Sequence, residues 1–354
     1  MREPSIMRAV VLEDVKRAEV RSMPIPTPGP REALIRVGAV GICGTDLELY
    51  NGHHSKAQFP VVPGHEWSGT IVQLGEGVTE FVAGDQVVGE TSIACGHCSF
   101  CRKGRYNLCL NLAENGIFGK DGAMAEYMTY PVSMLHRVDH SVAPDVACLV
   151  EPAAVAYRAV LRLAVQPGEA VAVVGAGPIG LLTVCMLKAF GVRRVVAFDS
   201  RPLRLDLARQ LGADETVNVG TTMAGGASAA GSIASAEREP FDAVVEASGN
   251  RGAIERVLEL CAPGSRLCLL GGCGGQKAGM DIDTIIRYDM DLFGSLGSPS
   301  VWPAVVKLFE SKTIDFGKLV SHRISMDGYK QALAIMEARD ESIVKMVILP
   351  QREA

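Results

Sequence analysis

The clearest pattern of apolar and polar positions lies in the middle of the chain. The fully apolar run AVAVV at 170–174 is followed by the glycine-rich GAGPIG and then by another apolar stretch. This order predicts a buried strand, a tight turn and a helix. No charge occurs from Ala170 to Leu187, which is about the length of a transmembrane helix. Gly175, Gly177 and Pro178 interrupt the run, so we predict no membrane span.

The same alternation continues toward the C-terminus. An amphipathic helix is predicted at 201–213, and strands are predicted at 193–199, 215–219, 241–249 and 264–272. Strands that alternate with helices are typical of an α/β fold with a parallel sheet. Near the N-terminus, the run RAVVLE at 8–13 also predicts a strand. The Gly-, Ala- and Ser-rich stretch at 220–235 lies at a crossover, and we expect a mobile surface segment there.

Composition and charge narrow the class of protein. A chain of 354 residues is long enough for two domains, and its 48% hydrophobic content indicates a globular protein. The net charge of −5 gives no reason to expect nucleic acid or an anionic membrane as a partner. Charged residues scattered through the first twenty positions leave no apolar signal-peptide segment. We therefore expect a cytoplasmic protein, in which clustered cysteines bind metal more readily than they form disulfides.

Four cysteines with the spacing C-x2-C-x2-C-x7-C form the strongest local motif. They are Cys95, Cys98, Cys101 and Cys109. Four thiolates suit a closed tetrahedral structural zinc site, and Arg102, Lys103 and Arg105 would offset its negative charge. An iron–sulfur cluster and a redox dithiol are the alternatives. We favour zinc.

A second candidate metal site combines a thiol, an imidazole and carboxylates. Cys43 lies in GICGTD, and the adjacent His65 and Glu66 lie in PGHEWSG. A catalytic zinc needs three protein ligands and an exchangeable position. Adjacent residues of a regular strand point to opposite faces, so His65 and Glu66 can both bind only if Pro63-Gly64 bends the backbone. Glu66 is then an intermittent ligand or a neighbour of the ligands, and Glu151 in LVEPAAV is the other candidate.

Each of these residues also has an ordinary structural interpretation, as a packed cysteine or histidine or as an ion-paired carboxylate. The four-cysteine motif makes the metal interpretation the better one, because the two sets together are far more specific than either alone. The remaining histidines have no such context and are expected to be surface or structural residues: His53, His54, His97, His136, His140 and His322.

The glycine-rich turn predicts a dinucleotide site. Gly175 permits the tight turn, Gly177 lets a pyrophosphate approach the backbone, and Gly180 lets helix and strand pack closely. The pyrophosphate would lie at the helix N-terminus. Asp199 ends the next strand at the expected distance of about 20 residues, where a carboxylate favours NAD over NADP. Arg201 and Arg204 could soften that preference. The predicted contacts are Gly175, Gly177, Pro178, Ile179, Gly180, Asp199 and Arg204.

On these motifs the chain resembles the zinc-dependent medium-chain alcohol dehydrogenase superfamily, and within it the polyol branch of sorbitol, threonine and glucose dehydrogenases. The resemblance implies a GroES-like catalytic domain over 1–153 with a structural zinc lobe at 95–109. It also implies a Rossmann domain over 154–295 and a return to the catalytic domain over 296–354. It further implies two zinc ions per chain, NAD as coenzyme and a homodimer or homotetramer. In the polyol branch a glutamate, here Glu151, takes the place of a second cysteine of the catalytic zinc site.

The resemblance also implies a reaction. A zinc held by Cys43, His65 and a glutamate would activate a secondary alcohol, and hydride would pass to the nicotinamide. Thr45 would take the hydroxyl proton and pass it on through the ribose or toward Glu48, although it could be only a turn residue. The expected substrate is a polyol, sugar or (amino)cyclitol.

Two departures from the branch bear on the substrate. Sorbitol and threonine dehydrogenases have histidine where this chain has Glu48, and sorbitol dehydrogenases have an Arg-Tyr pair where it has Gly297-Ser298. Sorbitol and threonine themselves are therefore doubtful. A threonine 3-dehydrogenase-like enzyme, a zinc-free reductase of the superfamily and a non-catalytic zinc- and dinucleotide-binding protein are the alternatives.

Overall fold

The computed structural model describes residues 5–220 and 240–351, and the segment predicted to be mobile lies outside them apart from Gly220. The chain forms two compact units: Met1–Glu151 together with Gly297–Ala354, and Pro152–Leu296. The division falls inside one helix, α3 (Val150–Leu163), so no linker composition marks it in the sequence.

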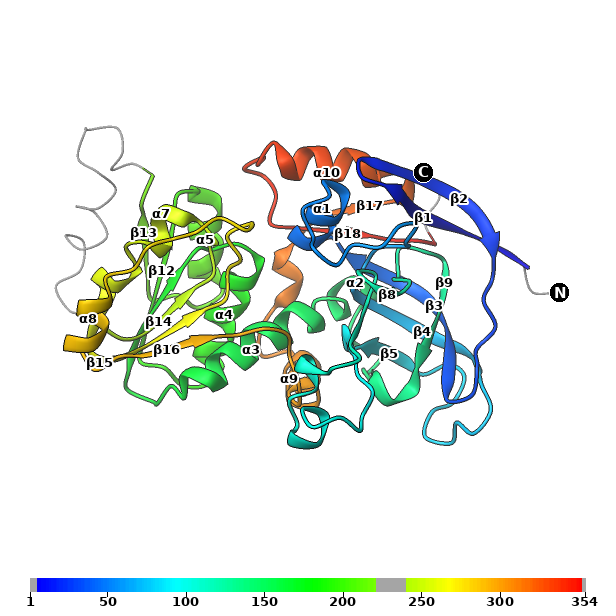
Figure 1. Cartoon of the computed structure of the whole chain (residues 1–354), viewed down its shortest axis with the longest axis horizontal. Helices are drawn as coiled ribbons and strands as arrows, with labels where there is room; N and C mark the ends of the chain where they lie inside the picture. The colour runs from blue at the N-terminus through cyan, green and yellow to red at the C-terminus, as the bar shows by residue number, and fades with distance from the viewer. Residues whose placement is uncertain (1–4, 221–239, 352–354) are drawn as a thin grey trace. The chain divides into compact units, whose positions relative to one another are not determined.

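The first unit is built on a seven-stranded sheet. Its strands are β3 (Glu32–Gly41), β4 (Glu66–Leu74), β5 (Gln86–Gly89), β9 (Tyr127–Pro131), β10 (Leu135–Arg137), β17 (Val320–Ile324) and β18 (Lys345–Ile348). They are paired in the order β10-β5-β4-β3-β18-β17, and β9 also pairs with β3. The last segment of the chain therefore supplies two strands of a sheet that the first segment begins (Figure 1).

Smaller elements complete this unit. They are the ribbon β1 (Ile6–Asp14) with β2 (Arg17–Pro24), the small sheet of β6 (Ser92–Ile93), β7 (Ala113–Asn115) and β8 (Gly119–Lys120), and the helices α1 (Gly44–Tyr50), α2 (Pro144–Ala147), α9 (Trp302–Ser311) and α10 (Tyr329–Glu337). The strand predicted at 8–13 is therefore confirmed within β1.

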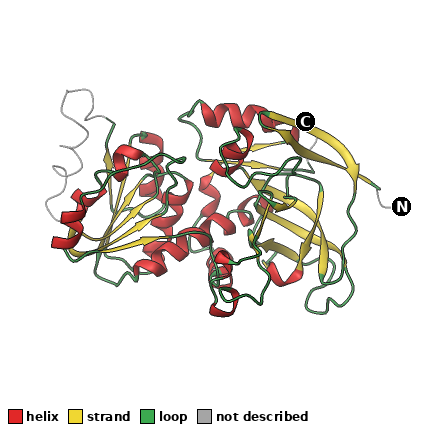
Figure 2. Cartoon of the chain, in the orientation of Figure 1, coloured by secondary structure: helices red, strands yellow, loops and turns green. Residues whose placement is uncertain are grey.

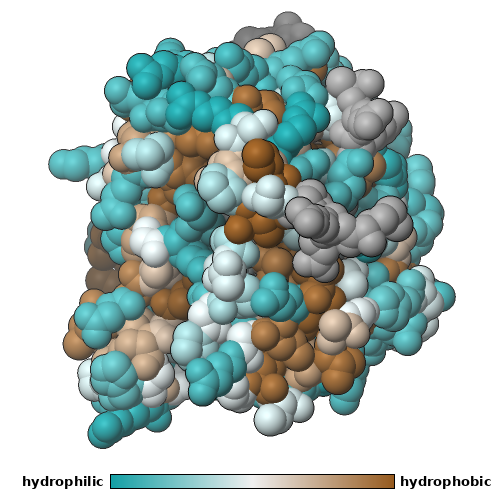
Figure 3. Space-filling model, turned by 90° about the vertical axis from the view of Figure 1, so that its right-hand side faces the viewer, coloured by the Kyte–Doolittle hydropathy of each residue, from teal (hydrophilic) through white to brown (hydrophobic). Residues whose placement is uncertain are grey.

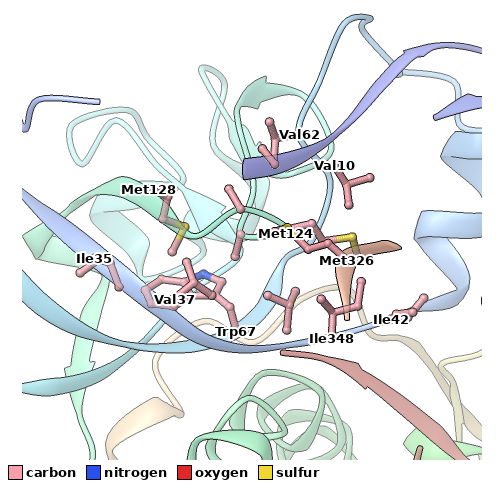
Figure 4. Close-up of a cluster of buried hydrophobic side chains, with 14 of the residues drawn as sticks. Val10, Ile35, Val37, Ile42, Val62, Trp67, Met124, Met128, Met326 and Ile348 are labelled. Atoms are coloured by element: carbon pink, nitrogen blue, oxygen red, sulfur yellow. The ribbon is translucent and has the colours of Figure 1, made fainter. Parts of the chain in front are cut away.

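The core of the first unit lies on one face of this sheet. Alternate residues of β3, among them Ile35 and Val37, point into it together with Trp67 of β4 and Ile348 of β18. Figure 4 shows these side chains converging with methionines from distant segments, including Met124. Burial of these apolar side chains fixes the register of the sheet, because a slip by one residue would turn them toward solvent.

Three chain segments meet at one end of this sheet, and they position the candidate metal centre. Gly41, the last residue of β3, pairs with Glu66, the first residue of β4, and also with Val347 of β18. The next amide, that of Ile42, donates to the carbonyl of Met346 at 2.9 Å. The pairing brings Cys43 and the residues around Glu66 to the same place as Lys345, which lies hundreds of positions further along the chain.

The second unit is a doubly wound α/β domain (Figure 2). Its six parallel strands are β11 (Ala170–Val174), β12 (Arg194–Asp199), β13 (Glu215–Asn218), β14 (Phe241–Glu246), β15 (Cys261–Leu269) and β16 (Asp291–Gly294). Their order β13-β12-β11-β14-β15-β16 is that of the Rossmann fold. Its other helices are α4 (Pro178–Ala189), α5 (Pro202–Gln210), α7 (Arg251–Ile254) and α8 (Ile282–Arg287). The predicted α/β class, strands and helix are confirmed.

In the described part of the chain, no helix is both long enough and apolar enough to cross a membrane. Apolar side chains on the face drawn in Figure 3 form patches between polar ones. The uncharged run from Ala170 to Leu187 is divided between β11 and α4, as its glycines predict.

Candidate metal centres and dinucleotide site

The four-cysteine lobe has the geometry of a closed metal site. One sulfur from each of Cys95, Cys98, Cys101 and Cys109 lies within 4.8 Å of all the others. The Cys98 and Cys101 sulfurs are 3.4 Å apart, and the Cys95–Cys101 and Cys98–Cys109 sulfur pairs are each 4.0 Å apart. Four sulfurs about 2.3 Å from a tetrahedral zinc would be about 3.8 Å from one another. The cysteines are unbonded thiols whose spacing fits zinc.

Backbone amides in the lobe favour the thiolate form. The amides of Cys95 and Asn111 both donate to the Cys109 sulfur at 3.3 Å. Nearby backbone groups, that of His97 first, lower the pKa of Cys95 to about 6. Burial and the neighbouring thiols raise the pKa of Cys101 to about 12, so a cation is needed to hold all four cysteines as thiolates, the form that binds metal. Arg102, Lys103 and Arg105 are exposed around the lobe.

The second group brings together Cys43, His65 and Glu66, each with one ligand atom within 4.8 Å of the other two. His65 and Glu66 are buried and Cys43 is half-buried. The Nδ1 atom of His65 is buried without a hydrogen-bond partner in the described part of the chain. A ring nitrogen left unpaired beside a thiol and a carboxylate fits a metal ligand, because buried polar atoms otherwise find partners.

A bend before β4 lets adjacent residues face one site. Gly64 has φ +99°, a left-handed conformation that glycine adopts without steric cost. A Cβ at Gly64 would lie 2.8 Å from Met124 Cγ and from Val40 Cγ1, so no larger residue fits. His65 therefore stands outside the regular strand that Glu66 begins, and the predicted bend at Pro63-Gly64 is present.

Glu66 is engaged by a lysine that the sequence analysis missed. The Nζ of Lys345 forms a buried ion pair with Glu66 Oε2. Burial opposes the charge on Lys345, but the neighbouring Glu66 and Cys43 outweigh it and raise the pKa of Lys345. A side chain at Gly41 would collide with this ion pair, which explains the glycine. Glu66 can approach a metal only in competition with Lys345.

Glu151 is buried near this group but outside the cluster of three. Its Oε1 accepts a hydrogen bond from Thr91 Oγ1 at 2.8 Å. Burial raises the pKa of Glu151 to about 7, although the charge of His65 opposes the shift. A nearby cation would stabilise the charged form of a carboxyl whose pKa is raised in this way, so Glu151 fits either the third ligand position or a group that contacts the ligands.

Helix α1 carries the other predicted residues. Thr45 Oγ1 lies 3.8 Å from the Cys43 sulfur, and Glu48 is half-buried on the same helix. Asp46, which the sequence analysis did not single out, is fully buried and accepts a hydrogen bond from the Cys43 amide at 2.7 Å. Asp46 thereby fixes the backbone of the cysteine.

The electrostatics of the second group favour a cation. Burial alone would lower the pKa of His65, but Cys43 and two nearby carboxylates raise it well above 6.5. The same negative groups would stabilise a divalent metal in place of the proton.

In the second unit, the predicted glycines adopt the required geometry. Gly175 has φ +95°, and a Cβ there would lie 2.7 Å from Ser248 Cα. A Cβ at Gly180 would collide with the Gly175 carbonyl. Gly177 caps α4, and Pro178 and Ile179 form its first turn. The free N–H groups of such a turn suit a pyrophosphate, and β11 and β14 lie where the strand order reverses.

Asp199 lies where the coenzyme ribose is expected. Its Oδ2 accepts from the Ala176 amide at 2.7 Å and its Oδ1 from the Arg201 amide at 2.9 Å. These bonds orient the carboxylate and leave lone pairs for ribose hydroxyls, since each oxygen can accept two hydrogen bonds. An ideal Cβ at Gly177 would be 3.6 Å from Nη1 of Arg204, so the arginine lies close to the turn.

A buried glutamate braces the adjoining loop. Glu246, the last residue of β14, is fully buried and accepts from the amides of Ser248 at 3.0 Å and Gly249 at 3.3 Å. Burial raises the pKa of Glu246 in spite of these bonds. The brace holds Ser248 against Gly175.

Some of these missed residues left a signal in the sequence and others did not. Asp46 stands three positions after Cys43, as an acidic residue does when it returns to a helix N-cap. Lys345 interrupts the apolar run IVKMVIL, and a lone charge in a buried strand predicts an ion pair. Thr91 carried no such signal.

Comparisons with known proteins agree with this geometry. The family described as alcohol dehydrogenase GroES-like domain matches residues 29–140, and the family described as zinc-binding dehydrogenase matches residues 178–311. The chain is 29% identical to a sorbitol dehydrogenase of Bacillus subtilis over 99% of both chains. It is 34% identical to an L-threonine 3-dehydrogenase of Xanthomonas campestris over 94% of this chain and 96% of that one.

A solved structure shows the same likeness in three dimensions. A zinc-binding dehydrogenase from Sinorhizobium meliloti 1021, bound to NADP, superposes with a TM-score of 0.89 at 30% identity. The match covers 98% of this chain and all of the other.

Proposed function

Since the chain belongs to the zinc-dependent medium-chain alcohol dehydrogenase superfamily and is an NAD(P)-dependent alcohol dehydrogenase, we propose that its substrate is a secondary alcohol of a polyol, sugar or (amino)cyclitol, which it interconverts with the ketone. The observation that carries the proposal is the buried group of Cys43, His65 and Glu66, with Glu151 beside it.

The first unit would hold the catalytic metal and the second would bind the coenzyme. Cys43 and His65 would be ligands, and Glu151 or Glu66 would supply the third position. When bound, zinc supplies a Lewis acid for the substrate oxygen, and the dinucleotide accepts or returns the hydride. The four-cysteine lobe would hold a second zinc without an open position, so it serves the structure rather than the reaction.

Proton transfer falls to helix α1. Thr45 Oγ1 lies beside Cys43, so a hydroxyl group brought to the metal would be within its reach. Thr45 would accept the substrate's hydroxyl proton while it gives up its own, and Glu48 on the same helix is a half-buried carboxylate that could receive the proton given up.

The carboxylates near the metal support a polyhydroxylated substrate. By the resemblance, Glu48 takes the place of a histidine of sorbitol and threonine dehydrogenases, and it would add an acceptor for a neighbouring hydroxyl. Gly297 and Ser298 are small, and the Ser298 hydroxyl already accepts a hydrogen bond from Trp302 at 3.2 Å. We expect this small pair to leave room for a ring or an amino substituent, because the resemblance places a large Arg-Tyr pair there in sorbitol dehydrogenases.

The substrate proposal is tested by coenzyme reduction across polyols, cyclitols, aminocyclitols, ethanol and threonine. A buried acceptor left unpaired costs about 1–3 kcal/mol, so a vicinal diol should exceed its mono-hydroxyl analogue about 5- to 150-fold in kcat/KM. Equal efficiency would mean that the carboxylates do not bind substrate. A preference for threonine would favour the threonine 3-dehydrogenase-like alternative.

We also propose that NAD is preferred over NADP through Asp199. Asp199→Ser should raise the KM for NAD about 10- to 150-fold, because hydrogen bonds to a charged group are worth about 1.5–3 kcal/mol. The substitution should also reduce the difference in KM between NAD and NADP, because Arg201 and Arg204 could then contact the 2′-phosphate of NADP. Asp206→Ser, an exposed position of α5, is the matched control. A wild type that works better with NADP would contradict the proposal.

We also propose that the protein forms a homodimer or homotetramer and that it acts in the cytoplasm. Strand β16 lies at the edge of the six-stranded sheet, and large apolar side chains are exposed near it in sequence: Ile282, Ile286 and Leu296. An open edge beside exposed apolar side chains favours pairing with another copy. Sedimentation of the purified protein tests the assembly. A chain that sediments as a monomer would contradict it.

A further inference from the structure

Glu90 is a buried carboxylate with no role in the reaction described above. It follows the last residue of β5, and its carboxylate is shared by two partners. Tyr106 donates its hydroxyl to Oε2 at 2.6 Å, and His136 Nε2 lies 2.9 Å from Oε1. The Glu90 backbone is held as well, because its carbonyl accepts from the Tyr130 hydroxyl and its amide donates to Met134. A buried charge is tolerated only when its hydrogen bonds are satisfied in this way.

The partners of Glu90 belong to two separate segments. Tyr106 lies inside the four-cysteine lobe, in the single-turn helix Tyr106–Leu108 that precedes Cys109. The Tyr106 hydroxyl also accepts a hydrogen bond from the Ser300 amide at 2.7 Å. The lobe is thereby tied both to Glu90 and to the segment that leads into α9.

His136 makes the second connection to the same segment. The ring of His136 stacks on that of Trp302, with centroids 5.4 Å apart and planes at 10°. Trp302 is fully buried, and its indole N–H bonds Ser298. The Glu90 carboxylate therefore lies between the lobe and the segment Gly297–Trp302. It bonds Tyr106 of the lobe directly, and it reaches the segment through His136, which stacks on Trp302.

The residue after Glu90 contacts the candidate metal centre. Thr91 donates to Glu151 Oε1 at 2.8 Å, and its carbonyl accepts from the Asn115 amide at 3.0 Å. Asn115 is fully buried and its side chain donates to the carbonyl of Gly64, the residue before His65, at 3.1 Å. Thr91 and Asn115 thus support two segments that carry predicted ligands, and the position of Thr91 depends on the anchored residue before it.

We infer that Glu90 is a positioning residue, through which the four-cysteine lobe and the segment Gly297–Trp302 hold Thr91, and through Thr91 the ligand candidate Glu151, in place. The inference rests on the proposed function for the assignment of the catalytic metal. Partners that orient metal ligands typically contribute 10- to 100-fold to metal affinity or activity. Because Glu90 acts one residue further away, the expected effect is about tenfold.

The test uses the full-length zinc-loaded protein with Tyr106→Phe, which keeps the ring and removes the hydroxyl from Glu90 and Ser300. Zinc content, the rate at which zinc passes to a chelator, kcat and KM are measured. We expect two zinc ions per chain, release of the more exchangeable zinc about tenfold faster than in the wild type, and a lower kcat. Tyr127→Phe, at a half-buried tyrosine of β9, is the matched control and should match the wild type.

A second pair of variants separates positioning from simple support of the fold. In Glu90→Gln the amide oxygen can still accept a hydrogen bond from Tyr106, so this variant should release zinc almost as slowly as the wild type. Glu90→Ala has no acceptor at this position and should release zinc faster. If Glu90→Ala does not fold, Tyr106→Phe and Glu90→Gln decide.

Two results would overturn the inference. One is zinc release and kcat in Tyr106→Phe equal to those of the control. The other is loss of the lobe zinc together with the exchangeable one, which would limit Tyr106 to stabilising the lobe. If the wild type oxidises none of the alcohols tested, the proposed function fails, and the zinc-release rates still decide the role of Glu90.

Discussion

The two metal-binding groups of this chain are opposite in almost every respect. The four-cysteine lobe takes all its ligands from positions 95–109, and three of its cysteines are half-buried while Cys109 is buried. The second group takes Cys43 from the N-cap of α1, His65 from the bend before β4 and Glu66 from the start of β4, and Glu151 comes from α3. The lobe offers four equal thiols, whereas the second group mixes a thiol, an imidazole and carboxylates.

The difference shows what a structural metal site and a catalytic metal site each require of the chain. A closed site needs only local spacing, because four thiolates complete a tetrahedron without help. An open site must hold unlike ligands with a position left for substrate, so it depends on neighbours such as Asp46, Thr91 and Lys345. The lobe therefore depends on the sequence of one loop, whereas the second group depends on how distant segments of the chain fold together.

The largest expected effect comes from removing the thiol of the open site. Cys43→Ser should lower kcat by about a thousandfold or more, because a metal supplies several kcal/mol of transition-state stabilisation. The variant should keep its fold and the lobe zinc. Kinetics, metal analysis and circular dichroism check this. Turnover within tenfold of the wild type would remove Cys43 from the metal site.

The matching change in the lobe should act on stability. Cys98→Ser should lose one zinc, make the lobe sensitive to proteolysis and lower the thermal midpoint or disrupt assembly, because structural zinc contributes directly to folding. A loss of a few kcal/mol would lower the midpoint by about 5 °C or more. Calorimetry with metal analysis provides the measurement. An unchanged midpoint with two zinc ions would show that the four cysteines do not form a metal site.

The buried ion pair of Lys345 and Glu66 allows the contribution of the fold at the open site to be measured apart from that of the metal. Lys345→Met should destabilise the zinc-free protein by about 3–5 kcal/mol, since Glu66 would keep a buried charge without a partner. Added zinc should reduce the loss, because the cation can compensate Glu66. Denaturant unfolding with and without zinc measures both values. The double variant with Glu66→Gln should recover most of the stability, and a double variant as unstable as Lys345→Met would contradict the pairing.

An exposed ion pair of the same unit should give the smallest effect. Hydrogen bonds from Arg31 lower the pKa of Glu80 from 4.5 to about 2. A carboxyl whose pKa is depressed by folding contributes stability above its unfolded value, and that stability is lost as the pH falls through the folded value. Glu80→Gln should therefore lower the unfolding midpoint slightly at neutral pH, less as the pH falls toward 2, and not at all below pH 2. A difference between variant and wild type that is as large below pH 2 as at neutral pH would contradict the pairing, and high salt should also reduce the difference at neutral pH.

The strands of the second unit and the four cysteines of the lobe could be predicted almost completely from the sequence, because both depend on local patterns. The run AVAVV, the glycines that follow it and the strands after them could be predicted from spacing, and so could the four cysteines. Cys43, His65 and Glu66 could be named from their motifs, but their convergence depends on the pairing of Gly41 with Glu66 and Val347. The ion-pair partner of Lys345 and the roles of Thr91 and Glu90 could not be predicted, because each of these residues acts on another that the fold brings to it from elsewhere in the chain.

The most direct test of the account is the metal content of the purified protein, followed over time against a chelator. The account predicts two zinc ions per chain, one released readily and one retained, with dehydrogenase activity lost in step with the first. A single zinc per chain, or the absorption bands of an iron–sulfur cluster, would contradict it.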